Sequence, residues 1–575
     1  MASSEAGSNV IRVVYDLTPH YPTKGIEVGY QAPAMELARR RPAVLAIDGP
    51  AALSWERFLR GLREALSSYG LRIHEVDVRR YLRPWAEIER ATEGGALLGD
   101  PEFARMGQAS LSSVFAGLPP APPSAGVTVV FGPGSALVRH DRLWYADLPK
   151  RVAAQRIRSG EAGNVGQPPG EAGTERRLMF IDWPIQDRHK HALARSWDRY
   201  LDCTDPDRPR SIPGEALRSA LASLSRRPFR ARPVFVPGSW GGQWMRRVLG
   251  AGADAPNLAW SYELITPESG LLLGSGELLE VGFEVLMAQG GEEVVGEEVA
   301  GRFGRSFPVR FDYLDTVGGT NLSVHCHPRP SYMRETFGWP YTQHESYYVM
   351  ATRPGARIFL GLRQEADLGD FRAEAERAER EEVPFEIDRY VQSFPARLHQ
   401  LYLIPAGTPH ASGEGNLVLE ISSTPYLYSL RFYDWLHGDL DGSLRPVHLR
   451  HAFANLDSGL RGGEVARRLI QEPEVVRSIP GCTELALGRL PELFFAVHRL
   501  DFEEEVFDDT DGRFHVLNLV EGEEVVVETA EGSVHPLSYA ETIVIPAVVG
   551  RYRLRRTGGG PYKAVKAFVR PGGNV

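Results

Sequence analysis

Long apolar runs and basic segments are missing from this 575-residue sequence. No stretch of 18 apolar residues occurs, so we expect no membrane-spanning helix. The first residues, MASSEAGSNVIRVVYDL, lack the basic start and apolar core of a secretory signal. The formal net charge is −9 and no basic stripe is visible, which argues against nucleic-acid binding. The sequence therefore predicts a cytoplasmic protein with neither membrane nor nucleic acid as partner.

Cysteine is also scarce. The three cysteines, Cys203, Cys326 and Cys482, lie far apart and form no C-x-x-C pair. This pattern again favours the cytoplasm. What the sequence does have is 43% hydrophobic and 24% charged residues, values typical of a globular protein. Since single cores rarely exceed about 250–300 residues, we expect three or four domains.

Strands alternating with helices are predicted between Pro42 and Asp202. The first unit joins an apolar strand, VLAID, through a Gly-Pro turn to the amphipathic segment LSWERFLRGLREALSSYG. Alternation of this kind is typical of a doubly wound, mostly parallel sheet. We therefore predict an N-terminal α/β domain over residues 1–228.

This α/β region resembles, loosely, the P-loop kinases of the uridine kinase type. A phosphate loop needs G-x-x-x-x-G-K-[ST], but here PAAL follows Gly49, and Ser54, Trp55 and Glu56 come next. The second glycine, the lysine and the hydroxyl residue are all absent. We therefore predict a degenerate kinase-like domain, structural or ligand-sensing, and keep an active phosphotransferase as the alternative. A polar site or an ordinary solvated helix start would account equally for a further set of residues, Asp147, Arg188, His189 and Lys190.

Four metal-ligand side chains occur in three short strand-like segments. His325 and His327 stand in LSVHCHP, Glu345 in TQHESYYV and His410 in LIPAGTPHA. Alternate residues of a strand point to one face, so both imidazoles of the H-x-H pair aim the same way, and the thiol of Cys326 aims away. Three imidazoles and a carboxylate suit one divalent metal per chain, Zn, Fe, Mn, Ni or Co, and the ligand types alone do not choose among them.

The region from about Pro237 to Trp435 resembles the type I mannose-6-phosphate isomerases, which are cupin proteins. The matching segments follow one another in the family's order: PGSWGGQWMRRVLG, AWSYEL, FPVRFDYLDTVGGTNLSVHCHP, HESYYVMATRPGARIFLGL, IPAGTPHASGEGNLVLEIS and LRFYDW. A weaker match runs from FFAVHRL to the C-terminus. The resemblance implies two all-β cupin (jelly-roll) barrels. The first is a metal-binding barrel over 229–445 with a helical insertion at 367–392. Residues 446–575 are expected to form a helical bridge and a second, metal-free barrel.

The resemblance also implies roles for individual residues. The metal ligands fall on His325, His327, Glu345 and His410, the first replacing the family's usual glutamine. With this resemblance zinc is the expected metal, and Fe, Mn, Ni or Co are the alternatives. Glu420 matches a carboxylate suggested for proton transfer, and Arg431 matches an arginine thought to act on substrate oxygens. One departure concerns the family's K-T-E, whose lysine helps to hold the substrate: it reads QHE at 343–345.

These residues predict a metal-dependent aldose–ketose isomerase. The reaction moves a proton between adjacent carbons through an enediolate, whose negative charge a divalent metal stabilises. The expected partner is a small sugar or sugar phosphate, most simply mannose 6-phosphate converted to fructose 6-phosphate. Self-association into a homo-oligomer is left open.

Several alternatives remain at this stage. Glu420 could be a buried carboxylate paired with Arg431 without chemistry. His344 could be the base instead, or an exposed neighbour of Glu345. The whole chain could be a carbohydrate sensor that binds without turnover, or another cupin metalloenzyme such as an Fe(II) dioxygenase, because fold alone does not decide chemistry.

Overall fold

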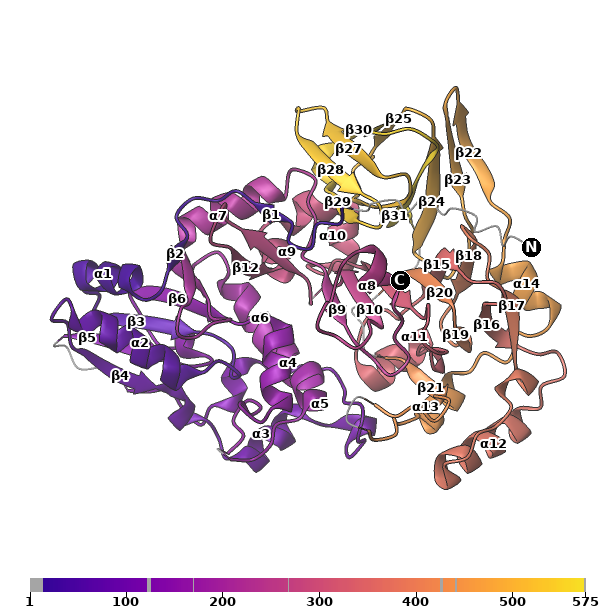
Figure 1. The fold of residues 1–575 in the computed structure, drawn as a ribbon. Coiled ribbons are helices and arrows are strands. Elements are labelled where there is room, and N and C mark those ends of the chain that lie inside the picture. The colour runs from indigo at the N-terminus through magenta and orange to yellow at the C-terminus, as the bar shows by residue number, and fades with distance from the viewer. Residues whose placement is uncertain are drawn as a thin grey trace, which may run out of the picture.

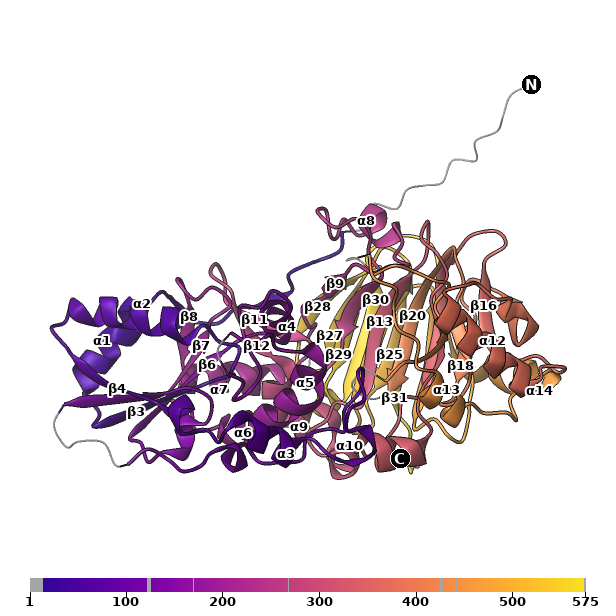
Figure 2. The same ribbon diagram turned by 90° about the horizontal axis from the view of Figure 1, so that it is seen from below.

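The computed structural model describes residues 14–120, 126–168, 170–266, 268–423, 428–439 and 442–572. An α/β domain at the N-terminal end lies beside two β-barrels, with the last barrel stacked on the first (Figure 1). Seen from below, the two barrels overlap, and the α/β domain extends away from them (Figure 2). Over the described ranges, no helix has the length and apolar character needed to cross a membrane.

The N-terminal domain contains a seven-stranded sheet in the order β2-β8-β7-β6-β3-β5-β4. The five strands β7-β6-β3-β5-β4 run parallel, as the sequence predicts, while β8 and β2 extend the sheet in antiparallel fashion. The strands are β2 (Glu27–Val28), β3 (Val44–Asp48), β4 (Ile73–Asp77), β5 (Val127–Phe131), β6 (Arg142–Asp147), β7 (Arg199–Asp202) and β8 (Arg210–Pro213). The helices are α1 (Gln31–Arg40), α2 (Trp55–Ser67), α3 (Trp85–Thr92), α4 (Lys150–Arg158), α5 (Glu175–Arg177), α6 (Trp183–Leu193) and α7 (Gly214–Leu224).

The turn after β3, where a phosphate loop would stand, has its backbone amides occupied by the protein itself. Asp48, at the end of β3, accepts hydrogen bonds from the amides of Gly49 (2.8 Å), Gly134 (3.1 Å) and Ala136 (2.8 Å). Amide groups of this kind would otherwise be free to hold an anion. The indole of Trp55 is fully buried at the start of α2. The loop is thus closed by the protein's own groups, and kinship with kinases stays a prediction.

Ion pairs close the carboxyl edge of this sheet against the next part of the chain. Lys190 Nζ contacts Asp147 Oδ2 at 2.5 Å and Glu284 Oε1 at 2.7 Å. Arg151 makes two hydrogen bonds to Glu280, at 2.6 and 2.7 Å. Ligands of open α/β sheets usually bind at this edge. Here the edge serves as a domain interface, formed with β12 (Leu279–Gly282) and α9 (Phe283–Val295).

The central barrel consists of two facing antiparallel sheets. One has the order β18-β15-β20-β13-β10-β9 and the other β17-β16-β19-β14-β21. The strands are β9 (Val234–Val236), β10 (Trp260–Leu264), β13 (Val309–Asp315), β14 (Val324–Cys326), β15 (Glu345–Thr352), β16 (Arg357–Leu362), β17 (Val391–Pro395), β18 (Leu401–Ile404), β19 (His410–Ser412), β20 (Asn416–Ser423) and β21 (Leu430–Tyr433). A small sheet, β1 (His20–Tyr21), β11 (Gly270–Leu273) and β12, joins the N-terminal segment to this region.

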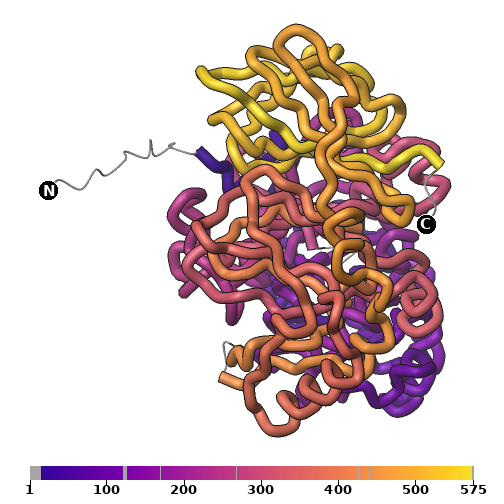
Figure 3. The backbone as a smooth tube through the Cα atoms, turned by 90° about the vertical axis from the view of Figure 1, so that its right-hand side faces the viewer, coloured from indigo at the N-terminus to yellow at the C-terminus, as the bar shows by residue number. Residues whose placement is uncertain are grey.

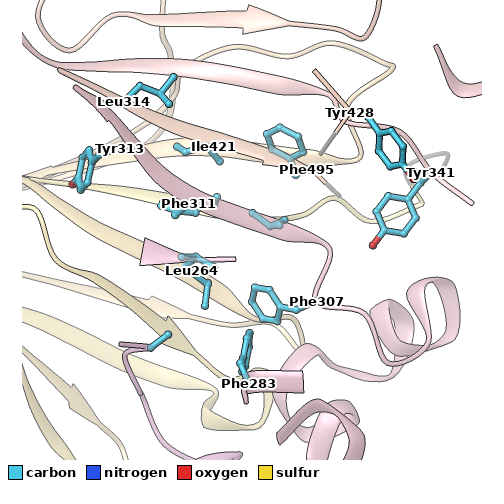
Figure 4. Packing of buried hydrophobic residues seen from close by; sticks show 14 of the residues in the cluster. Leu264, Phe283, Phe307, Phe311, Tyr313, Leu314, Tyr341, Ile421, Tyr428 and Phe495 are labelled. Atoms are coloured by element: carbon cyan, nitrogen blue, oxygen red, sulfur yellow. The ribbon is translucent and has the colours of Figure 1, made fainter. Parts of the chain in front are cut away.

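The six-stranded sheet is buried on both faces, and its strands alternate accordingly. Phe311, Tyr313 and Ile421 belong to one buried cluster with Phe495 of the last barrel (Figure 4). The hydroxyl of Tyr313 donates a hydrogen bond to Asn518 Oδ1 at 3.0 Å. Since neighbours along a strand face opposite ways, the intervening residues of β13 and β20 point into the central barrel.

Helices between the barrels differ in part from the prediction. The helical insertion predicted at 367–392 is present as α12 (Leu368–Glu381), with β17 starting at Val391. The predicted helical bridge is helical only as α13 (Leu449–Asn455) and α14 (Gly463–Leu469). The rest of this prediction is wrong, because β22 (Glu474–Ile479) and β23 (Cys482–Ala486) form a hairpin that extends the last barrel.

The last barrel, at the top of Figure 3, again has two sheets. Their orders are β22-β23-β24-β31-β26-β29 and β25-β30-β27-β28. The strands are β24 (Phe495–Phe502), β25 (Glu505–Asp509), β26 (His515–Glu521), β27 (Glu524–Thr529), β28 (Val534–Ser538), β29 (Thr542–Ile545), β30 (Arg551–Arg556) and β31 (Tyr562–Val569). The predicted domain limits of 1 and 575 fall outside the described residues.

Candidate metal centre

Both sheets of the central barrel contribute to one cluster of metal-ligand side chains. His325 lies on β14 directly opposite His410 on β19, and His327 follows two residues after His325. Glu345 begins β15 in the facing sheet. The candidate ligand atoms of the four residues all lie within 4.8 Å of one another, and all four side chains are buried. The structure thus brings together all four residues that the spaced motifs indicate.

Backbone carbonyls orient the three imidazoles. Nδ1 of His325 lies 2.8 Å from the carbonyl oxygen of Ser323, and Nδ1 of His410 lies 2.9 Å from that of Thr408. Nδ1 of His327 lies 3.2 Å from the carbonyl oxygen of Tyr428. Only a protonated Nδ1 can donate to a carbonyl, so each ring leaves Nε2 as the free lone pair. This is the tautomer that metal-binding histidines need.

The electrostatics of the cluster agree with this arrangement. Burial lowers the pKa of His325 well below its usual range, and burial likewise lowers the pKa of His327. Burial alone would raise the pKa of Glu345, but the His410 and His327 imidazoles hold that pKa well below its ordinary value. Neutral imidazoles beside an ionised carboxylate are the protonation states in which these groups bind a cation.

Two further observations fit a divalent metal. Oε2 of Glu345 lies 2.5 Å from Nε2 of His327 and 3.2 Å from Nε2 of His410, so the donor atoms converge on one point. Nε2 of His410 is buried without a hydrogen-bond partner in the part of the chain that the structure describes. Such an orphaned nitrogen is costly unless something binds it. The thiol of Cys326, as predicted, points elsewhere, toward the carbonyl of Ala452 at 3.7 Å.

Glu420 faces the same interior but is paired with an arginine that the motifs did not indicate. On β20 it stands opposite Asp312 of β13 and Tyr347 of β15, and Glu345 stands opposite Ser422 two residues on. Directly opposite residues share a face, so these side chains line one surface. That surface faces the three histidines.

The partner of Glu420 is Arg310. Its guanidinium contacts Glu420 Oε1 through both Nη2 and Nε, the latter at 3.1 Å. Gln343 donates to the same oxygen at 3.2 Å. Burial raises the pKa of Glu420 well above its usual range, and Arg310 opposes that rise only in part. The alternative in which Glu420 pairs with Arg431 is therefore wrong as to the partner.

Arg431 occupies a different place in the site. It lies on β21 directly opposite His325, and its Nη2 lies 3.2 Å from Nε2 of His448. Burial and, to a smaller extent, the neighbouring Arg445 lower the pKa of Arg431 to about 10. No ion pair of its guanidinium with a carboxylate appears among the described residues, and its Nε has no hydrogen-bond partner there.

His344 contradicts the expectation of an exposed neighbour. It is buried, its Nδ1 accepts a hydrogen bond from the amide of Ala406 at 3.1 Å, and burial lowers its pKa to about 4. As the residue directly before Glu345, it faces away from that carboxylate. The face it reaches is covered rather than open to solvent, because the six-stranded sheet is buried on both sides.

The N-terminal domain reaches the edge of this site. Phe103 packs against Tyr428, whose carbonyl orients His327, and against His448, with centroid separations of 6.3 and 4.7 Å. Asp100, three residues earlier, accepts a hydrogen bond from His451 at 2.7 Å. The α/β domain therefore helps to fix the backbone that holds the cluster.

The comparisons with known proteins give two kinds of match. Residues 29–226 match a family described as a domain of unknown function (DUF8485). The chain is also similar in sequence to mannose-6-phosphate isomerases. One relative, the mannose-6-phosphate isomerase of Streptococcus mutans, is 25% identical over 248 residues, which cover 40% of this chain and 69% of the relative.

A second relative, mannose-6-phosphate isomerase ManA of Bacillus subtilis, is 23% identical over 254 residues. These cover 44% of this chain and 73% of the relative. Among solved structures, a mannose 6-phosphate isomerase from Bacillus subtilis matches with a TM-score of 0.49 and 20% identity, over 59% of this chain and 99% of that chain. Homology to mannose-6-phosphate isomerases thus supports an isomerase, with a cluster that could hold its metal.

Proposed function

We propose that the protein is a metal-dependent aldose–ketose isomerase acting on mannose 6-phosphate and fructose 6-phosphate or a closely related sugar. The observation that carries the proposal is the convergence of three Nε2 atoms and one carboxylate oxygen in the central barrel, with a second, protonatable carboxylate on the same interior surface. His325, His327, Glu345 and His410 would hold the metal. When bound, a divalent metal supplies Lewis-acid stabilisation of negative charge on substrate oxygen.

Glu420 moves the proton between the two substrate carbons in this proposal. An ordinary glutamate is too acidic to hold a proton near neutral pH, and a raised pKa brings the carboxyl toward the range in which it can both accept and return one. Burial raises the pKa of Glu420, and Arg310 keeps part of its charge compensated. Arg310 therefore acts as a positioning residue, since its contact with Glu420 Oε1 fixes the orientation of the carboxyl.

The cations of the site suit a substrate with oxygen-borne negative charge. The family's lysine is replaced by Gln343, but Arg310 lies beside the same carboxylate as Gln343 and places a buried cation in that interior. Arg431, with no carboxylate partner among the described residues, is available for substrate oxygens. Arg310 thus supplies a cation beside Gln343, and Arg431 supplies a second cation elsewhere in the site.

The test combines metal analysis with an isomerase assay on the full chain. We expect about one divalent metal per chain by mass spectrometry and conversion of mannose 6-phosphate to fructose 6-phosphate. His327→Ala should lose both, with a fall in kcat of at least about 10³-fold, because several kcal/mol of charge stabilisation disappear. His498→Ala removes a histidine from the last barrel and serves as the matched control that keeps metal and activity.

The outcomes separate the parts of the proposal. Metal without turnover on any hexose phosphate would contradict the isomerase and leave a binding protein. Turnover that survives His327→Ala would place the chemistry outside this cluster. Turnover of another sugar alone, lost in the variant, would keep the reaction and change the substrate.

A further inference from the structure

A cavity lies between the N-terminal domain and the part of the chain that forms the central barrel. Its volume is about 250 Å³, and the four candidate metal ligands are not among the described residues that line it. One wall belongs to α6, where Trp183, Asp187 and His191 recur at every fourth position. Side chains with this spacing share one face of a helix, so all three point toward the same space. Other walls come from residues beyond the N-terminal domain, such as Arg305 and Met333.

The body of the cavity is apolar and aromatic. Its lining includes Met106, Met179, Trp183, Met333, Trp339 and Tyr428. Thioether groups make favourable contacts with aromatic rings and adapt to the shape of a ligand. An apolar cavity of roughly 150 Å³ holds benzene, so a larger one has room for an aromatic ring with a short substituent.

The two carboxylates in the lining are already paired with lysines. Oδ1 and Oδ2 of Asp187 lie 2.8 and 2.6 Å from Nζ of Lys150. Oε1 of Glu284 lies 2.7 Å from Nζ of Lys190. The negative charge of both side chains is therefore compensated within the protein.

The two arginines in the lining are bonded to carbonyl groups instead. Nη2 of Arg188 donates to the carbonyls of Gly107 (2.8 Å) and Ala109 (2.6 Å), and Nη1 of Arg305 donates to that of His191 at 3.4 Å. Neither guanidinium forms an ion pair with a carboxylate in the ranges that the structure describes. A carbonyl orients a guanidinium but leaves its charge uncompensated and most of its N–H groups free. Because its acids are neutralised and its arginines are not, the cavity favours an anion.

Several buried polar atoms of the lining have no hydrogen-bond partner among the described residues. They include Nε2 of His191, Oγ1 of Thr266, Oε2 of Glu284 and the hydroxyl of Tyr428. Glu284 is only 5% exposed and Tyr428 only 3%. Buried polar atoms without partners are costly, so their presence around one cavity indicates a ligand that pairs with them. A carboxylate oxygen can only accept, so this ligand needs an N–H or O–H group of its own.

We propose that this cavity binds a small aromatic carboxylate whose ring carries an N–H or O–H group. The ring would lie among the methionine and tryptophan side chains, and its N–H or O–H group would donate to Oε2 of Glu284. Arg188 and Arg305 would bind the carboxylate. The inference depends on neither the metal nor the isomerase reaction. It gives the N-terminal domain a binding role at its contact with the rest of the chain.

The experiment uses the full chain after removal of divalent metal by dialysis against a chelator, so that a carboxylate cannot bind a metal in the central barrel. Calorimetric titration compares indole-3-acetate and 4-hydroxyphenylacetate with indole-3-acetamide, an uncharged compound of the same shape as the first acid. We expect both acids to bind, and the amide to bind at least about tenfold more weakly, because it makes no charge-assisted hydrogen bond.

Replacement of the arginines locates the site. Arg188→Gln and Arg305→Gln should each weaken binding of the acids by about tenfold and leave binding of the amide unchanged. Arg195→Gln is the matched control. Arg195 is also exposed and bonded to a carbonyl, that of Gln289, but it is not among the residues that line the cavity. Its replacement should leave both affinities unchanged.

Four results would overturn the proposal. These are the absence of binding by both acids, equal affinity for indole-3-acetate and its amide, acid affinities that neither arginine variant lowers, and tighter binding of mannose 6-phosphate than of either acid. Because Arg188 and Arg305 are exposed, their replacement should not unfold the protein, and circular dichroism of the variants checks this. Failure here would leave the isomerase proposal intact, since every measurement is made without metal.

Discussion

The two barrels place polar side chains in their interiors in two different ways. In the central barrel the donor atoms converge, and Nε2 of His410 is left without a hydrogen-bond partner among the described residues. In the last barrel the buried groups satisfy one another, with Lys566 held between Glu484 and Asp508. Both interiors contain histidines and carboxylates, yet only the first presents several lone pairs to a single point.

This difference teaches how a metal cluster is distinguished from an internal ion-pair network. Composition does not separate them, because each barrel has buried His, Glu and cationic residues. The position of the donor atoms does: the candidate ligand atoms of four residues lie within 4.8 Å of one another in the central barrel, whereas in the last barrel Glu484 already pairs with Lys566 and with Nδ1 of His498, at 2.8 Å. A ring whose Nδ1 donates to a carbonyl or to a carboxylate keeps Nε2 in either case, so a metal site needs several such nitrogens at one point.

The largest expected effect tests whether the carboxylate of Glu420 takes part in catalysis or only supports the fold. Glu420→Gln should lower kcat by about 10²–10⁴-fold, because proton transfer by a positioned general base typically contributes that much. Metal content should stay at the wild-type level, since Glu420 is not a ligand. Steady-state kinetics together with metal analysis measure both quantities.

Glu541→Gln is the matched control for this variant. Glu541 is also a buried carboxylate paired with an arginine, Arg230, at 2.7 Å, but it lies outside the central barrel. Its replacement should cost stability and spare kcat. Equal loss of activity in both variants, in proportion to their loss of stability, would show that Glu420 acts only through folding.

Removal of the metal should affect the two barrels unequally. A ligand present at 100 times its dissociation constant stabilises the folded state by about 2.7 kcal/mol. Chelation should therefore lower hydrogen-exchange protection by up to about 100-fold in β14 and β19, which carry the histidines. Protection of β24 and β31 in the last barrel should stay unchanged. Equal loss in both barrels would mean that the metal supports the whole fold rather than one sheet.

Much of the metal cluster could be predicted from the sequence because its signals are local. H-x-H in a strand fixes the relative direction of two imidazoles, and P-A-G-T-P-H ends a strand in a turn that presents a third. Arg310 was missed although a signal existed. In FPVRFDYLD, Arg310 and Asp312 are two residues apart and alternate with Val309, Phe311 and Tyr313, so both must enter the same interior. Charges with that spacing in a buried strand indicate an ion pair or a site.

Other features depended on information that no local pattern contains. His344 faces away from Glu345, as alternation requires, but whether that face meets solvent depends on how the last barrel packs. The hairpin at 474–486 could have been predicted from the sequence. A Pro-Gly turn, with Gly481 at φ +75°, separates β-branched residues there and favours a hairpin over a helix. The role of the N-terminal domain as a support for Tyr428 could not be inferred before the contact with Phe103 was known.

The smallest expected effect concerns the acid stability of the last barrel. Burial lowers the pKa of His515 to about 3, whereas the histidine titrates near its ordinary value in the unfolded chain. Between those values the unfolded chain binds a proton that the folded barrel does not, so stability falls as pH falls from about 6.5, by up to about 1.4 kcal/mol per pH unit for this group. Burial alone would raise the pKa of Glu484, but His498 and Lys566 stabilise the charged form and lower that pKa to about 2. Glu484 therefore also makes stability fall with falling pH, but only below its ordinary pKa near 4.5.

Denaturation by urea at pH 7 and pH 5 therefore isolates the histidine contribution. His515→Gln should reduce the loss of unfolding free energy between these two values by about 1–2 kcal/mol relative to the wild type. His20→Gln, at an exposed position, should leave the pH dependence as it is. If the unfolding free energy of His515→Gln changed with pH as much as that of the wild type, protonation of this imidazole in the folded barrel would cost no free energy. The last barrel would then no longer differ from the central barrel by having a neutral interior whose polar groups satisfy one another.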